Sequence, residues 1–488
     1  MHETRSTVVS VGAAGVAGVA GSFAVAGFTP AFVGAALAAV VARVTPGVVV
    51  TAAITTLGDL GKLVNVAAAL ALAVVLFGAL ALFAVAVARA LDSVVAAPVV
   101  TGFGVFAVAT LVTGAPLASL GAGVAAGGTL AVSQIAGGRV TGTDEATPEP
   151  ERRRVLASLA AAAAAVGPGY LLGRSRGPDP NEQTSVDDPI VRRLLDEAAG
   201  KSLDVDGLEP LVSDEFYRVD ISAAAPTIDP EEWGLTVTGA VDESVELGYD
   251  ELTAMESEER FATLRCVGEP LNGRKMDTAL WTVVPLTDLL DRAGVDGNCC
   301  VMLRAADDYY EEFPLAALRE GMLAYRMNGE PLPRKHGAPV RALIPGHWGE
   351  INVKWLTEIE VLDEPAEGYW EERGWHGTGP VNTVAKLHAV NRDDGVIEVA
   401  GHAYAGTRGV SAVEVSTDGG ETWEEAALSE QLPGEDVWRQ WAYEYESPGT
   451  AHEVVVRARE ADGTLQPEDR TNSFPSGPTG WVSRELDG

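Results

Sequence analysis

The sequence predicts a multi-domain protein with three parts: an N-terminal all-α transmembrane bundle, an α+β domain and a C-terminal β-sandwich of immunoglobulin type. Long runs of apolar residues fill the first third of the 488 residues. Short strands and helices then alternate, which is typical of an α+β domain, and the end consists of short alternating strands between turns. We place the boundaries at 1–174, 175–213 (a linker), 214–382 and 383–488.

The apolar runs of the first part are long enough to cross a membrane, which takes about 20 residues. Four of them lie at roughly 8–28, 63–88, 94–113 and 116–137. A further run at 31–57 contains Arg43 and Pro46-Gly47, so it either spans the membrane or forms two shorter helices that dip into it. Buried helices of a soluble protein are the alternative, but so many runs without polar residues argue against it.

A polar loop at 138–151 leads to Arg152-Arg153-Arg154 and then to another apolar run, 157–172. This order resembles a twin-arginine export signal set inside the chain; the alternative is an ordinary positive-inside anchor. Both interpretations place the arginines in the cytoplasm and everything after Arg174 outside the cell. We therefore expect a multi-pass protein of the cell membrane with five or six spans and its larger part on the extracellular side.

The soluble part is strongly acidic. The chain has 69 acidic and 35 basic residues, a formal net charge of -34, and all but six of the acids follow residue 150. Such a surface repels itself in dilute buffer and is tolerable where salt screens it, so we expect a halophilic source. No basic patch exists to neutralise phosphates, which argues against nucleic acid as a partner.

Three cysteines are too few for a disulfide framework. Cys299 and Cys300 stand next to each other in a short apolar run that predicts a buried strand, and we expect both to pack as separate thiols. Cys266 is a different case, because Arg265, Arg274 and Lys275 surround it in the sequence.

Positive neighbours favour the thiolate form of Cys266, and a soft thiolate suits a redox-active transition metal. The structural alternative is that Cys266 is a small buried apolar residue. Gly- and Pro-rich turns follow, with His336-Gly337-Ala338-Pro339-Val340-Arg341 and Asn352-Val353-Lys354-Trp355-Leu356. Such turns leave side-chain donors available for a phosphate or a polar heterocycle.

This ordered set of motifs resembles the molybdenum-cofactor domain of the sulfite oxidase family, over about half the chain. The resemblance implies that Cys266 ligates molybdenum beside the two dithiolene sulfurs of a single pyranopterin and leaves oxo positions open to substrate. Arg218 would face the substrate, and the hydroxyl of Tyr325 would reach an oxo or water ligand; as an alternative, Tyr325 is a core aromatic residue. The residues implied to hold the pterin and its phosphate are Asp307, His336, Arg341, Asn352, Val353 and Lys354.

The sequence departs from the family where the substrate would bind. The family follows its ligand cysteine with Ala-Gly-Asn-Arg-Arg, whereas this chain has Val267-Gly268-Glu269-Pro270-Leu271, and Val219 and Asp220 replace an Asn and a His after Arg218. A small oxyanion such as sulfite would therefore meet a weaker positive field. A neutral S-oxide or N-oxide substrate, reduced instead of oxidised, is a comparable expectation, and a non-catalytic extracellular binding or assembly module that has lost the metal is a further alternative.

The remaining expectations concern partners. The stretch 413–420 resembles the dimerisation domain of the same family, which implies a possible homodimer, and we expect Trp438 and Trp441 in a core or an interface. His2 is the only histidine before the linker, and no Cys-x-x-Cys-His and no Gly-x-Gly-x-x-Gly after a strand occurs. We therefore expect no haem, no nicotinamide and no flavin, and a separate electron carrier.

Overall fold

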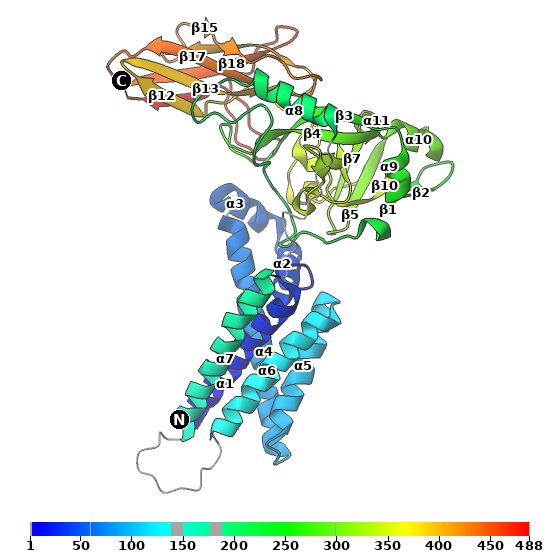
Figure 1. Cartoon of the computed structure of the whole chain (residues 1–488), viewed down its shortest axis with the longest axis vertical. Coiled ribbons are helices and arrows are strands. Elements are labelled where there is room, and N and C mark those ends of the chain that lie inside the picture. Colours follow the sequence, from blue (N-terminus) through cyan, green and yellow to red (C-terminus); the bar gives the residue numbers. More distant parts are fainter. Residues whose placement is uncertain (1, 59, 138–149, 176–187, 298, 488) are drawn as a thin grey trace. The chain divides into compact units, whose positions relative to one another are not determined.

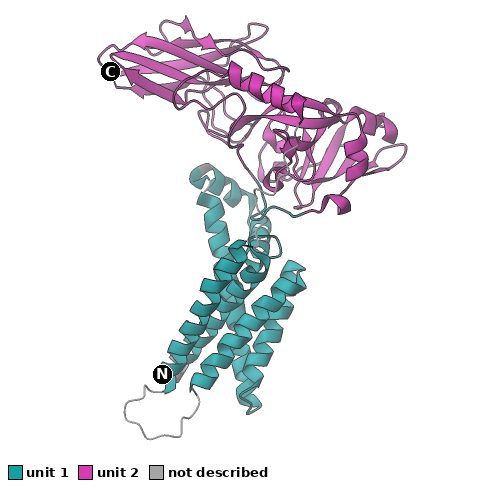
Figure 2. Ribbon diagram, viewed as in Figure 1, with its two compact units in different colours: residues 1–182, 220–227 teal, residues 183–219, 228–488 magenta. Residues whose placement is uncertain are grey.

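The computed structural model of the chain describes residues 2–58, 60–137, 150–175, 188–297 and 299–487 (Figure 1). Residues 138–149 of the predicted polar loop (138–151) and residues 176–187 of the predicted linker (175–213) lie outside these residues. The chain divides into two compact units (Figure 2). Unit 1 comprises residues 1–182 and 220–227, and unit 2 comprises residues 183–219 and 228–488.

The described part of unit 1 is helical. Its helices are α1 (His2–Ala26), α2 (Val33–Val44), α3 (Gly47–Leu57), α4 (Leu60–Ala90), α5 (Ala96–Thr113), α6 (Pro116–Gly137) and α7 (Pro150–Ser175). Five of them, α1 and α4 to α7, are long and apolar enough to cross a membrane. The doubtful run at 31–57 takes the form of two shorter helices, α2 and α3, bent by 112°. Pro46 explains the break, because the residue before a proline is disfavoured in helical conformation.

Helix α1 packs closely against α6 and α7. A side chain at Gly21 would collide with the backbone oxygen of Gly121 on α6, so the two helices approach at a pair of small residues, as membrane helices commonly do. Half a helix away, the buried hydroxyl of Ser10 lies 2.8 Å from that of Ser133 and 2.9 Å from that of Ser158. Small residues and one polar cluster therefore fix α1 against its neighbours.

Unit 2 begins with α8 (Pro189–Lys201) and continues into an α+β region with two sheets (Figure 1). The first has the order β2 (Val245–Gly248), β1 (Gly234–Gly239), β10 (Leu356–Leu362), β5 (Cys300–Ala305) and β6 (Tyr310–Pro314), in which only β1 and β10 are parallel. The second, antiparallel sheet contains β3 (Glu258–Arg265), β4 (Met276–Pro285), β7 (Met322–Met327), β8 (Glu330–Pro331) and β9 (Arg341–Leu343). Short helices α9 (Tyr249–Ala254), α10 (Thr287–Ala293) and α11 (Leu315–Arg319) and the 3-10 turns η1 (Pro230–Glu232), η2 (Arg334–His336), η3 (Gly349–Ile351) and η4 (Glu371–Arg373) connect the strands.

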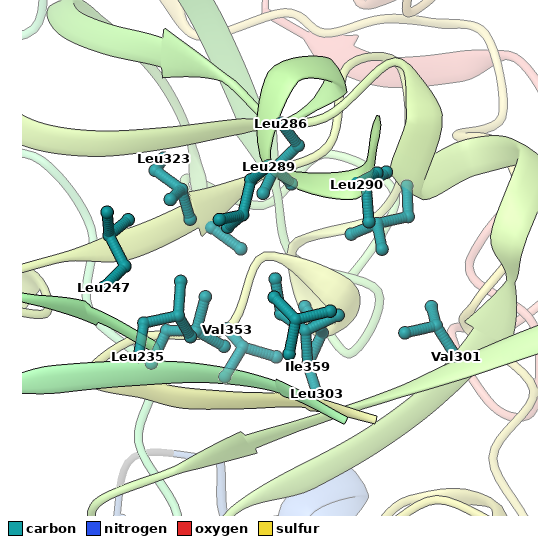
Figure 3. Close-up of a cluster of buried hydrophobic side chains, with 14 of the residues drawn as sticks. Leu235, Leu247, Leu286, Leu289, Leu290, Val301, Leu303, Leu323, Val353 and Ile359 are labelled. Atoms are coloured by element: carbon teal, nitrogen blue, oxygen red, sulfur yellow. The ribbon is translucent and has the colours of Figure 1, made fainter. Parts of the chain in front are cut away.

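The main core of this region contains aliphatic side chains from both sheets and from α10. Figure 3 shows them pointing toward one another from opposite sides. The labelled residues are Leu235, Leu247, Leu286, Leu289, Leu290, Val301, Leu303, Leu323, Val353 and Ile359. Fully burying a side chain of this size is worth about 1.5–3 kcal/mol, so this core holds the loops that follow the strands in fixed positions.

The C-terminal region consists of two antiparallel sheets that contact each other. One contains β11 (Val384–Ala385), β12 (Ala389–Asp393), β13 (Val396–Tyr404), β16 (Ala427–Leu428) and β17 (Arg439–Glu446); the other contains β14 (Val410–Ser416), β15 (Glu424–Glu425), β18 (His452–Glu460) and β19 (Val482–Leu486). Trp438 and Trp441 are almost fully buried and lie in the core, one of their two predicted places. The immunoglobulin type of this sandwich stays a prediction.

The prediction for Cys299 and Cys300 is wrong. The two residues are joined by a disulfide bond, with an S–S distance of 2.03 Å. Neighbouring side chains within a strand point to opposite faces, but β5 begins only at Cys300, so Cys299 is not bound by that alternation. Cys300 is buried, as predicted for a strand.

Candidate active site

Cys266 lies directly after β3, in the loop that connects β3 to β4. Arg265 and Met276 pair at the base of this loop, and the N–H of Cys266 donates a hydrogen bond to the carbonyl oxygen of Lys275 at 2.9 Å. Cys266 is half-buried as a residue, and it is the one cysteine outside the disulfide. A two-stranded ladder thus holds the sulfur in place while the loop beyond it stays irregular.

The surroundings of Cys266 do not favour a thiolate in the protein alone. Burial, Glu269 and Glu350 together raise the pKa of the thiol to about 11, against the opposing effects of the Gly268 N–H and Lys275. The prediction from the positive sequence neighbours is therefore wrong in this respect. Because a metal ion displaces the proton of its thiol ligand, the neutral thiol remains a suitable metal ligand.

Glu269, which the sequence places near the substrate as an unfavourable acid, is instead a buried member of an ion-pair network. Its carboxylate accepts hydrogen bonds from the side chains of Arg265 (3.2 Å) and Lys386 and from the N–H of Lys275 (2.7 Å). Although burial alone would raise it, Lys386 and Arg265 lower the pKa of Glu269. Arg265 is fully buried and also donates to the carbonyl oxygen of Asn382 at 2.7 Å, so the network joins the Cys266 loop to the C-terminal region.

Several cations gather around His336, which lies in η2. Burial and the charges of Arg341, Arg218 and Lys335 together lower the pKa of His336 to about 4. Burial and the charge of Arg218 likewise lower the pKa of Arg334. We call these five residues the basic group. Like charges this close together are typical of a site that binds a phosphate or another anion.

Lys354 adjoins the basic group. Its ammonium donates to the carbonyl oxygen of Val219 at 2.9 Å and lies 4.7 Å from the centre of the Trp355 ring. The bond to Val219 places Lys354 beside the backbone that carries Arg218. The structure thus brings together Arg218, His336, Arg341 and Lys354 of the predicted site.

Two other predicted residues have framework roles. The side chain of Asn352 is buried, accepts from the N–H of Ile344 at 2.7 Å and donates to the carbonyl oxygen of Trp348 at 3.0 Å. Val353 belongs to the main core. Arg341 itself is only 4% exposed and donates to the carbonyl oxygens of His336 (3.2 Å) and Asn352 (3.0 Å), so it also fixes the turns on which the basic group stands.

Tyr325 is a buried core residue, which agrees with its structural alternative and leaves its catalytic role untested. It lies in the main core, with its ring 6.5 Å from that of Tyr249 in an edge-to-face arrangement. It falls at an irregularity in the pairing of β7 with β4, between the paired residues Ala324 and Arg326. The role of its hydroxyl toward an oxo or water ligand stays a prediction.

Two tyrosines that the sequence analysis did not single out interact with Cys266 or with a residue that affects it. Burial and the charge of Cys266 raise the pKa of Tyr217 well above its usual value, which places this phenol close to the thiol. The hydroxyl oxygen of Tyr309 lies 2.8 Å from a carboxylate oxygen of Glu311 and 2.9 Å from the carbonyl oxygen of Glu350, so these two acceptors share its one proton. In the sequence, only the nearness of Tyr217 to Arg218 and of Tyr309 to Asp307 could have pointed to these two tyrosines.

Asp307 lies in the turn between β5 and β6. Burial raises the pKa of its carboxyl to about 6, while the N–H of Tyr309, 3.2 Å from one carboxylate oxygen, opposes this. This contact is local, and the role of Asp307 toward a pterin stays a prediction.

The sequence was compared with known protein families. Residues 222–370 match the oxidoreductase molybdopterin-binding domain, and residues 380–476 match the Mo-co oxidoreductase dimerisation domain. The chain belongs to the sulfite oxidase family of molybdopterin-dependent oxidoreductases. Apart from residues 222–227, both matched regions lie in unit 2, with Cys266 and the basic group within or beside the first.

Curated relatives match this same part of the chain. Mitochondrial sulfite oxidase of Mus musculus is 30% identical over 298 residues, which cover 50% of this chain and 55% of the relative. Sulfite oxidase of Gallus gallus is 28% identical, with coverages of 53% and 68%, and NADH nitrate reductase of Spinacia oleracea is 28% identical, with coverages of 50% and 34%. The chain thus spans about half the length of the first of these relatives. The crystal structure of the sulfane dehydrogenase SoxCD from Paracoccus pantotrophus aligns with a TM-score of 0.46 and 18% identity, covering 64% of this chain and 95% of that one.

Proposed function

We propose that the protein is a membrane-anchored molybdenum-dependent oxidoreductase that transfers an oxygen atom at molybdenum ligated by Cys266. The observation that carries this proposal is the position of Cys266: a half-buried cysteine outside the disulfide, fixed by the β3–β4 ladder inside the molybdopterin-binding domain.

The donors present fit the cofactor. A thiol that becomes a soft thiolate on metal binding suits molybdenum, and the basic group with Lys354 suits the phosphate of a single pyranopterin. When bound, the cofactor supplies the oxo positions at which one oxygen atom and two electrons are exchanged. The chain's own contribution is to bind the metal through Cys266, to hold the phosphate and to place the hydroxyl of Tyr217 beside the site.

The five long apolar helices support anchoring in the cell membrane. Arg152-Arg153-Arg154 fall in the first turns of α7, so either a positive-inside anchor or a twin-arginine signal would keep that end in the cytoplasm. The catalytic region would then stand on the extracellular side, where its 63 acidic residues after position 150 suit high salt. A separate electron carrier and a homodimer through the dimerisation domain are part of the proposal.

For the substrate, the structure gives a reason to test a neutral S-oxide or N-oxide beside sulfite. Glu269 and Glu350 both raise the pKa of Cys266, so the acids near the sulfur produce a negative field there. A dianion would be repelled by this field, although Arg218 attracts it. A neutral oxide carries no net charge, so it is neither strongly repelled by the field of the acids nor strongly attracted by Arg218.

The test uses the full chain, expressed in a host that synthesises the cofactor and purified in detergent at high salt. We expect about one molybdenum and one pterin per chain, and Cys266→Ser should lose the metal while keeping the circular dichroism spectrum of the parent. Sulfite-dependent reduction of a dye and oxidation of a reduced dye by sulfoxides then decide the direction. A correctly folded preparation without molybdenum or pterin would favour the non-catalytic module.

A further inference from the structure

Three glutamates from separate elements meet in unit 2. Glu311 lies on β6, Glu350 in η3 and Glu371 at the start of η4. One carboxylate oxygen from each lies within 4.8 Å of the other two. Glu311 is 0% exposed and Glu350 is 8% exposed, whereas Glu371 is half-buried. We call these residues the glutamate cluster.

Most oxygens of the glutamate cluster lack a donor. One oxygen of Glu311 and both oxygens of Glu350 and of Glu371 are buried and accept no well-aligned hydrogen bond within the described chain. The exception is the second oxygen of Glu311, which accepts from the hydroxyl of Tyr309 at 2.8 Å. Leaving buried carboxylates without partners is costly, so the protein alone does not satisfy these groups.

The charges of the cluster are also uncompensated. Burial and the charge of Glu371 raise the pKa of Glu350 to about 8, against which only the Gly377 N–H acts. Burial and the other two glutamates raise the pKa of Glu311 well above its usual value. No cationic side chain is among the causes of either shift.

Two glycines keep space around the cluster. A side chain at Gly368 would collide with Glu311 and come within 2.6 Å of Glu371, and one at Gly377 would collide with Glu350. Neither glycine has a positive φ angle, so the backbone conformation does not require them. The carboxylates explain why glycine stands at both positions, because they occupy the space that a side chain would need.

We propose that Glu311, Glu350 and Glu371 bind a divalent cation, and that Ca²⁺ fits best. Carboxylate oxygens are the ligands of hard cations. With Ca²⁺–O distances of about 2.3–2.6 Å, two ligands of one ion can stand up to roughly 5 Å apart, so three oxygens within 4.8 Å of one another can share one Ca²⁺. Mg²⁺ usually keeps several waters and takes only one or two carboxylates, so a set of three carboxylates favours Ca²⁺. The hydroxyl of Tyr309 then orients one ligand from outside, as supporting groups do at metal sites.

The cation site does not depend on the proposed activity, because none of its ligands is Cys266 or a member of the basic group. It does bear on the neighbouring sulfur. Glu350 contributes to the negative field at Cys266, so a bound dication would weaken that field.

The experiment measures Ca²⁺ on the purified full chain, made in a host that lacks the molybdenum cofactor, stripped with chelator and kept at high NaCl to screen exposed acids. Equilibrium dialysis with radioactive Ca²⁺ should find one tight site, with Mg²⁺ as a weaker competitor. Glu311→Gln and Glu350→Gln should each lower the affinity at least tenfold. Glu312→Gln, on the same strand, and Cys266→Ser should leave it unchanged, which separates this proposal from that of the molybdenum site.

A second readout keeps the test valid if the variants differ in folding. In chelator and at a pH above about 8, where Glu350 is ionised, Glu350→Gln should melt above the parent, because it removes an uncompensated buried charge. Added Ca²⁺ should raise the melting temperature of the parent and not that of the variant. Absence of a tight site in the parent, or equal Ca²⁺ affinity in the parent and both variants, would show that the cluster holds only shared protons and would overturn the proposal.

Discussion

Replacing Lys386 by methionine tests whether the buried network around Glu269 stabilises unit 2. The side chains of Lys386 and Glu269 are 0% and 1% exposed. Removing one partner of a buried ion pair costs about 3–5 kcal/mol. Arg265 at 3.2 Å and the N–H of Lys275 remain on Glu269 in the variant, so we expect the lower end of this range.

The assay is thermal unfolding of the detergent-solubilised full chain in high salt, followed by tryptophan fluorescence. A loss of about 3 kcal/mol in the free energy of unfolding lowers the melting temperature of a domain of roughly 150–250 residues by about 6 °C or more. Because Trp348 packs under Arg265, with 4.7 Å between the guanidinium and the ring centre, fluorescence reports on the network itself.

The matched control is Lys201→Met. Lys201 also pairs with a glutamate, Glu197, at 2.7 Å, but the two side chains are 17% and 40% exposed, and surface pairs are worth only about 0–1 kcal/mol. The double variant Glu269→Gln/Lys386→Met should regain much of the loss, because it leaves no buried charge without a partner. Equal melting temperatures for Lys386→Met and Lys201→Met would refute the reasoning.

Three further predictions follow from buried contacts. Burial and then Lys386 lower the pKa of His388 to about 4; since the unfolded value is about 6.5, stability is lost as the pH falls from about 6.5 to about 4, by at most roughly 3 kcal/mol, and His388→Gln should flatten this part of a melting profile. Gly121→Val should lower the melting temperature of the helical unit, because its side chain would press on α1, whereas Gly128→Val, with nothing within 4 Å, should not. Tyr325→Phe should change kcat by no more than about twofold, because a core tyrosine makes no contact with the transition state; a large fall in kcat at unchanged stability would restore the catalytic assignment.

The long apolar helices follow closely from the sequence, because they depend on local signals. The apolar runs are long enough to cross a bilayer, and Pro46 marks the break between α2 and α3. The tryptophans of the C-terminal region were placed for the same reason, since large aromatic side chains between alternating strands are buried more often than not.

The candidate site could be predicted only in part, because its charges are assigned by contacts between distant residues. Arg265 precedes Cys266 in the chain and reads as a positive neighbour, yet its side chain turns to Glu269. From the sequence, Glu269 is predicted to be an acid that faces the substrate. In the structure it pairs with Lys386, which lies more than a hundred residues later in the chain. No local pattern contains this information.

Comparing the two sets of acids near Cys266 shows how the electrostatics of the site is divided. Arg265 and Lys386 pair with Glu269 and offset part of its charge, although Glu269 still raises the pKa of Cys266 more than Glu350 does. The glutamate cluster has no such partner, and its charge at Glu350 reaches Cys266. The field that a substrate meets therefore depends on what occupies the cluster: protons or a dication lessen the repulsion of an anion, and ionised glutamates increase it. Sulfite and a neutral oxide would respond differently to that occupancy, so the choice between them is tied to the cation as well as to the residues that touch the substrate.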